Sequence, residues 1–140
     1  MDTSKPAVTS GNLQAARQLY AALRAQDPGA VLSALTPQFR GIVSEGMPAG
    51  LGGTYDGRET MLRDCLARVF AVIDLRPAPA EYLPVSADRM IVLGRYEGTA
   101  RTTGRPLSAA FAHILRFADG RVSELAQITD TARWHDALAQ

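Results

Sequence analysis

The stretch Leu51-Gly-Gly-Thr-Tyr-Asp-Gly-Arg-Glu-Thr-Met61 decides the fold class, because its glycines lead directly into an amphipathic segment. A glycine-rich loop before a helix can bind phosphate, but a Walker-type loop ends in Gly-Lys-Ser/Thr so that the lysine reaches the phosphate. Here Gly57 is followed by Arg58, and the strands downstream are predicted to be antiparallel, which argues against a dinucleotide-binding βαβ unit. We therefore interpret the stretch as the start of a helix, with Asp56 as the N-cap and Glu59 completing a capping box.

The patterns around this stretch predict an α+β fold. Apolar residues recur with helical spacing in the N-terminal part, whereas the C-terminal part alternates with a period of two between short turns. The element order is α-α-β-α-β-β-β-β-α, in which helices cover one face of a curved, largely antiparallel sheet. The predicted helices span residues 12–23, 28–35, 61–70 and 131–138, and the predicted strands span residues 39–45, 81–85, 90–100, 107–117 and 122–129.

Two aspartates mark helix starts in this order. Asp27 precedes Pro28, which suits the first helical position, and Asp130 precedes the last predicted helix, so both are interpreted as N-caps. Residues 1–10 are small and polar and are predicted to form a flexible tail. Residues 11–140 are predicted to form a single domain.

Composition excludes several classes of function. The 140 residues carry a formal net charge of +1, which gives no electrostatic reason to bind nucleic acid or an anionic membrane surface. No run approaches the roughly 20 apolar residues of a membrane span, so we predict a cytoplasmic protein. The single cysteine, Cys65, excludes an internal disulfide, and His113 and His135 lack metal-ligand spacing. We predict no metal and no cofactor.

Three motifs resemble those of one known superfamily. They are Gly53-Thr-Tyr-Asp-Gly-Arg-Glu59, His113-Ile-Leu-Arg-Phe-Ala-Asp-Gly-Arg-Val122 and Asp130-Thr-Ala132. Over residues 11–138 the chain resembles SnoaL-like proteins of the nuclear transport factor 2-like superfamily. The resemblance implies a cone-shaped fold, with a bent sheet wrapped around a long helix and an open pocket, and it implies a homodimer. Because this superfamily contains isomerases, cyclases, epoxide hydrolases, dehydratases and non-catalytic binders, the fold does not decide the activity.

His113 is the first candidate site residue. It shares strand parity with Phe111 and Leu115, so an ionisable ring stands on an otherwise apolar face. Such a ring is either a core histidine or a pocket residue. The resemblance implies a pocket residue, because ketosteroid isomerases have a protonated Asp and SnoaL cyclases an active-site His at this place. We expect His113 to donate a hydrogen bond to an enolate or to transfer a proton near neutral pH.

Tyr20 and Glu45 complete the predicted catalytic set. Tyr20 lies on the apolar stripe of the first helix, where the resemblance implies an oxyanion-hole tyrosine; the alternative is a packing tyrosine with its hydroxyl at the rim. Glu45 shares the parity of Phe39 and Val43 and resembles the general base of ketosteroid isomerases. An apolar pocket would raise the pKa of its carboxyl. The alternative is that Glu45 enters the polar loop that follows the strand.

Gln127 departs from the family pattern. SnoaL cyclases and limonene-epoxide-hydrolase-like enzymes have an Asp here, whereas an amide can bond a ligand but cannot transfer protons as a carboxylate does. Arg95 and Glu97 resemble the Arg-x-Asp pair of the epoxide hydrolases, although a solvent-side ion pair is favoured. Gln127, Phe111 and Trp134 are predicted ligand contacts.

These observations lead to one main hypothesis and two alternatives. The main hypothesis is an isomerase or cyclase that transfers protons without a cofactor in a hydrophobic carbonyl-containing or polyketide-like molecule, with His113, Tyr20 and Glu45 as catalytic residues. The first alternative is a non-catalytic module that binds a small hydrophobic molecule or forms a dimer, which the missing acid at position 127 favours. The second alternative is an epoxide-hydrolase-like enzyme.

Overall fold

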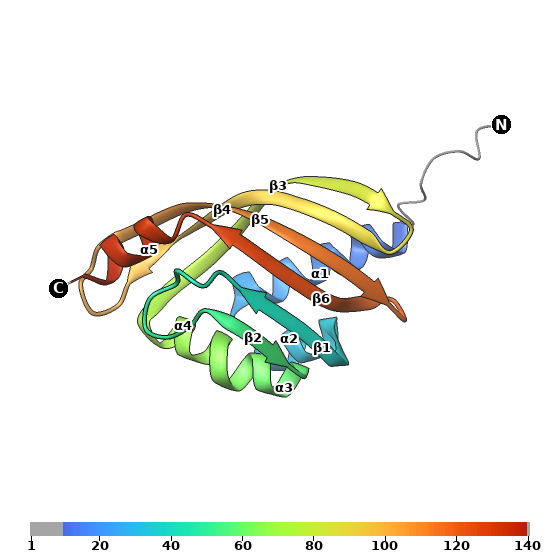
Figure 1. Cartoon of the computed structure of the whole chain (residues 1–140), viewed down its shortest axis with the longest axis horizontal. Coiled ribbons are helices and arrows are strands. Elements are labelled where there is room, and N and C mark those ends of the chain that lie inside the picture. Colours follow the sequence, from blue (N-terminus) through green and yellow to red (C-terminus); the bar gives the residue numbers. More distant parts are fainter. Residues whose placement is uncertain (1–9, 140) are drawn as a thin grey trace.

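The computed structural model describes residues 10–139, which form an α+β fold on one curved six-stranded sheet (Figure 1). The strands are β1 (Leu35–Val43), β2 (Gly53–Asp56), β3 (Ile73–Ser86), β4 (Arg89–Ala100), β5 (Pro106–Ala118) and β6 (Arg121–Thr129). Their order is β2-β1-β6-β5-β4-β3, with β1 and β6 parallel and the other neighbours antiparallel. The predicted α+β class and the predominantly antiparallel sheet are confirmed.

The helices are α1 (Ser10–Ala25), α2 (Pro28–Ala34), α3 (Arg58–Thr60), the π-helical segment η1 (Met61–Leu66), α4 (Ala67–Val72) and α5 (Thr131–Leu138). The sheet curves over α1 (Figure 1), whose apolar stripe is buried against it. None of the helices within residues 10–139 is long and apolar enough to cross a membrane. Residues 1–9 of the predicted tail lie outside the described residues.

The glycine-rich stretch differs from its prediction. Residues 53–56 form β2 and pair with β1, so the backbone of Asp56 is extended and belongs to the sheet. Gly57 takes the N-cap position of α3 with φ of 93°, and no side chain caps this helix. Asp56 instead contacts Arg40 at 3.6 Å. The predicted capping box is therefore wrong, because sheet pairing extends to the residue that was expected to cap the helix.

The other two predicted caps have different outcomes. Asp27 caps α2, since its carboxylate accepts from the Ala30 amide at 3.2 Å. Asp130 occupies the N-cap position of α5, but its side chain makes no capping bond and lies 3.7 Å from Arg133. The helix after the glycine-rich stretch is continuous through α3, η1 and α4, and it buries Met61, Cys65 and Val69 against the sheet.

Candidate functional site

A small cavity of about 60 Å³ lies between the inner face of the sheet and the η1–α4 helix. Its walls are mostly apolar, and three polar side chains meet at one end: Tyr96 from β4, His113 from β5 and Gln127 from β6. None of the Asp or Glu side chains within residues 10–139 lines it. The apolar and weakly polar lining residues are Leu23, Val43, Met47, Met61, Cys65, Leu66, Val69, Phe70, Leu75, Pro77, Leu125 and Trp134.

His113 is held at both ring nitrogens. It is 1% exposed, and its Nδ1 lies 2.7 Å from the hydroxyl of Tyr20 on α1. Its Nε2 lies 2.6 Å from the hydroxyl of Tyr96. Both partners are phenols, and the Phe111 ring stacks on the imidazole with centroids 4.0 Å apart. The ring is therefore fixed in position by hydrogen bonds and by aromatic packing.

Burial sets the protonation states of this cluster. Desolvation by burial lowers the pKa of His113 from 6.5 to about 3, because the charged imidazolium would lose its hydration inside the protein. Burial likewise raises the pKa of the Tyr20 and Tyr96 hydroxyls well above their usual range. At neutral pH the imidazole is neutral and both phenols keep their protons. His113 is thus poorly suited to the proton transfer near neutral pH that the sequence predicted.

Gln127 links the cluster to the loop of residues 44–52. Its Nε2 donates to the Tyr96 hydroxyl at 2.9 Å, and its Oε1 accepts from the Ser44 amide at 3.2 Å. The Ser44 hydroxyl also donates to the Gln127 carbonyl oxygen at 2.9 Å. One hydrogen-bonded chain therefore runs from α1 through β5, β4 and β6 to the start of that loop.

The comparisons with known proteins agree with this architecture. A protein-family model described as "SnoaL-like domain" matches residues 16–125. The chain belongs to the SnoaL-like domain family. It is similar to an NTF2-like protein of unknown function from Burkholderia pseudomallei, with 34% identity over 94% of this chain and 100% of the other and a TM-score of 0.85.

Two further solved structures resemble this SnoaL-like protein. TerC, co-crystallized with polyporic acid, is 31% identical over 94% of this chain and 100% of its own, with a TM-score of 0.84. An NTF2-like protein from Burkholderia thailandensis is 27% identical over 91% of this chain and 96% of its own, with a TM-score of 0.80. No curated protein matches the chain. These likenesses establish the family and the fold.

The predicted site residues of this SnoaL-like protein are only partly brought together. His113 and Gln127 line the cavity, and Trp134 does so from α5, where its Nε1 donates to Thr129 at 3.1 Å. Tyr20 bonds His113 but is not part of the cavity wall. Phe111 is not among the residues that line the cavity, and its ring stacks on His113; its contact with a ligand stays a prediction.

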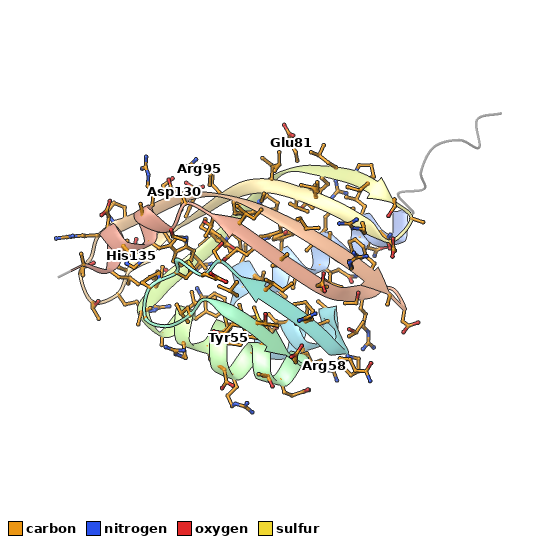
Figure 2. All side chains as sticks on the ribbon, in the orientation of Figure 1. Tyr55, Arg58, Glu81, Arg95, Asp130 and His135 are labelled. Atoms are coloured by element: carbon orange, nitrogen blue, oxygen red, sulfur yellow. The ribbon has the colours of Figure 1, made fainter. Side chains whose placement is uncertain are left out.

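The structure contradicts a pocket-facing Glu45 and agrees with the alternative, in which Glu45 enters the polar loop that follows the strand. The strand β1 ends at Val43, and Glu45 lies exposed in the turn that follows, outside the cavity wall. Strand parity failed here because it applies only while the backbone stays extended. Arg95 and Glu97 are both exposed, which agrees with the predicted solvent-side location, but the ion pairs of residues 10–139 do not include one between them. Arg95 points away from the molecule (Figure 2) and donates to the Ser108 hydroxyl at 3.1 Å. The arginine–acid–acid set of an epoxide hydrolase is not assembled in this cavity.

Tyr96 is a site residue that was not predicted from the sequence. Its neighbours Arg95 and Glu97 are exposed, whereas Tyr96 has the opposite parity and is buried together with Val92 and Met90. That parity was the signal in the sequence by which Tyr96 could have been found.

Cys65 also lines the cavity, and burial raises the pKa of its thiol to about 11, so it is a neutral apolar wall residue at neutral pH. Within residues 10–139 no cluster of His, Cys, Asp and Glu has the arrangement of a metal site.

Proposed function

We propose that this SnoaL-like protein binds a small hydrophobic molecule in the cavity and orients it through hydrogen bonds at the polar end. The observation that carries the proposal is the meeting of Tyr96, His113 and Gln127 at one end of an otherwise apolar cavity. An apolar pocket in which a small number of polar groups converge is typical of sites that bind small molecules. The 31% identical TerC, co-crystallized with polyporic acid, supports this proposal.

The size of the cavity implies that its walls move on binding. A free volume of about 60 Å³ is far below the roughly 300 Å³ of small ligand pockets. Met47 and Met61 form part of the wall, and methionine side chains adapt to irregular shapes because they are unbranched and flexible. We expect these side chains to change rotamer when a ligand enters.

The test is a comparison of ligand binding between the wild type and a filled cavity. Val69 is buried in the wall, so Val69→Phe would occupy the free space, whereas Val85→Phe adds the same ring to an exposed position on β3. Binding of acetophenone, followed by ligand-observed NMR, is expected in the wild type and Val85→Phe and should be lost in Val69→Phe. Equal binding by all three proteins would show that acetophenone binds outside this cavity and would contradict the proposal.

A second candidate function is cofactor-free catalysis of the isomerase or cyclase type. It is favoured by the buried hydrogen-bonded chain at the polar end, since donors fixed around a carbonyl stabilise the charge of an enolate. Because no carboxylate of residues 10–139 lines the cavity, the proton acceptor would be water or a group on the substrate. Exchange of the methyl protons of acetophenone in D2O, measured by NMR, tests this candidate. Exchange no faster than in buffer alone leaves the binding function in place and removes the catalytic one.

We also propose that the protein is a homodimer in which the outer face of the sheet is covered by a second copy. Cross-strand pairing aligns Leu93, Ala112 and Ile128 in one row and Ile91 and Ile114 in the next. Leu93 is 36% and Ile128 61% exposed. Apolar rows on an open sheet face favour burial against a partner, and a two-fold axis would place the same rows against each other.

A further inference from the structure

We propose that the hydroxyl of Tyr96 is the hydrogen-bond donor that the cavity offers its ligand, and that the matching ligand group is a carbonyl oxygen. This inference rests on the proposed binding function and names the residue and the chemical class behind it. It follows from counting the hydrogens in the chain that joins Tyr20, His113, Tyr96 and Gln127.

The hydrogen bond to Tyr20 fixes the tautomer of His113. A buried imidazole without a neighbouring carboxylate is neutral, so it carries one hydrogen and presents one acceptor. Within residues 10–139, the Tyr20 hydroxyl has one hydrogen-bond partner, Nδ1 of His113. If Nδ1 carried the hydrogen, the hydroxyl hydrogen of Tyr20 would be buried without an acceptor, which is costly. Tyr20 therefore donates to Nδ1, and the imidazole hydrogen is on Nε2.

The backbone N–H of Ser44 fixes the orientation of the Gln127 amide. Its Oε1 accepts from the backbone N–H of Ser44, and the reversed amide would place two donors against each other. The NH2 group therefore faces Tyr96 and donates to its hydroxyl oxygen. Because Nε2–H of His113 donates to the same oxygen, the Tyr96 oxygen accepts two hydrogen bonds.

The Tyr96 hydrogen is left available for a ligand. The two groups of residues 10–139 that bond this hydroxyl are both donors, so neither can accept its hydrogen. Tyr96 lines the cavity together with both of these donors, whereas Tyr20 does not, so the free O–H belongs to the cavity side of the chain. Two hydrogen bonds into the phenol oxygen also polarise its O–H and strengthen it as a donor.

This arrangement selects the chemistry of the ligand. A ketone offers an acceptor and brings no hydrogen of its own, so it satisfies the Tyr96 donor completely. An alcohol of the same shape brings a hydrogen that needs an acceptor, and the remaining wall is mostly apolar. We therefore expect acetophenone to bind more tightly than 1-phenylethanol, and 1-phenylethanol no more tightly than ethylbenzene.

The tautomer is tested without any ligand. In protein labelled with 15N-histidine, long-range proton–nitrogen correlation at about pH 7 should show His113 with a hydrogen on Nε2 and none on Nδ1; His113→Gln identifies which signals belong to His113 rather than His135. A hydrogen on Nδ1, or on both nitrogens, would overturn the inference whether or not a ligand binds.

The donor is tested with the Tyr96→Phe variant. This variant should bind acetophenone about 5- to 10-fold more weakly than the wild type, as expected for one lost hydrogen bond, and should bind ethylbenzene with unchanged affinity. The matched control is Tyr82→Phe, whose half-buried ring lies outside the cavity wall. Retained ethylbenzene binding shows that the variant is folded. Equal loss of both compounds, or no loss of the ketone, contradicts the inference, and failure of both compounds to bind the wild type contradicts the proposed function instead.

Discussion

Tyr96 and His113 form a hydrogen bond of 2.6 Å although they are not cross-strand partners. Tyr96 pairs with Ala109, and His113 pairs with Val92, so the two residues are offset by four positions along neighbouring strands. Their long side chains lean toward each other across the inner face of the sheet. The hydrogen bond therefore joins His113, which was predicted from the sequence as a site residue, to Tyr96, which was not.

Burial of His113 predicts that the protein loses stability in mild acid. The pKa of His113 is about 3 in the folded protein and 6.5 as a model value, so below about pH 6.5 the unfolded chain binds a proton that the folded protein does not. Stability from this residue is fully present above pH 6.5 and is lost as the pH falls toward 3, by at most about 1.4 kcal/mol per pH unit. Urea unfolding at several pH values measures this slope.

Variants separate His113 from the other acid-sensitive groups. His113→Gln is expected to be less stable than the wild type near pH 7.5, because it alters the hydrogen bonds to Tyr20 and Tyr96, but to lose less stability between about pH 7.5 and 4.5. Gln38→Ala, at an exposed position on β1, should keep the slope of the wild type because it removes no titratable group. An identical slope in His113→Gln and the wild type would show that folding does not lower the pKa of His113.

Replacement of Gln127 by glutamate is predicted to weaken ketone binding about tenfold. The carboxylate would still accept from the Ser44 amide, but it would also accept the hydroxyl hydrogen of Tyr96, which would then no longer face the ligand. Titration with acetophenone measures the effect, and Gln38→Glu, at an exposed position on β1, is the control. Unchanged or tighter binding by Gln127→Glu would contradict the assigned direction of the amide.

The sequence predicted which faces the site residues occupy but not how their side chains meet. Parity placed His113 on the buried face of β5 correctly, because side chains alternate strictly along a strand. The hydrogen bonds of His113 depend on the helix α1, which brings Tyr20 from 93 positions away, and on the offset contact with Tyr96. Neither depends on local spacing, so neither was visible in the sequence.

The errors of the sequence prediction concern the bounds of strands and one strand that was not foreseen; β3, for example, starts at Ile73 and not at residue 81. Glu45 was assigned to the inner face because the strand was extended two residues too far, and Asp56 was assigned to a cap because β2 was not foreseen. The four residues of β2 include Gly53 and Asp56, and Gly57 follows them. Because glycine and aspartate are depleted in strands, this segment has only a weak local preference for the sheet. Its pairing with β1 is a tertiary contact that overrides this preference.

The close approach of β3 and β4 predicts that Gly94→Ala is strongly destabilising. A Cβ at Gly94 would collide with the Ala78 carbonyl oxygen and would lie 2.7 Å from the Phe111 ring. Because backbone cannot yield as a flexible side chain does, we expect a loss of about 1–3 kcal/mol in the free energy of unfolding, measured in urea. Gly29→Ala on α2, where a Cβ meets the nearest atom at 3.7 Å, is the control and should be neutral or stabilising.

The proposed homodimer predicts that a charge at the centre of the outer sheet face separates the two copies. Ile128 is 61% exposed and stands in the row with Leu93 and Ala112, so Ile128→Arg would place two like charges close together across a two-fold axis and bury them at a cost. Light scattering after size-exclusion chromatography is expected to give twice the chain mass of 15.0 kDa for the wild type and the single mass for the variant. Thr102→Arg, in the exposed turn after β4, should remain a dimer. A wild type that elutes as a monomer, or an Ile128→Arg variant that remains a dimer, would show that this face is not the interface.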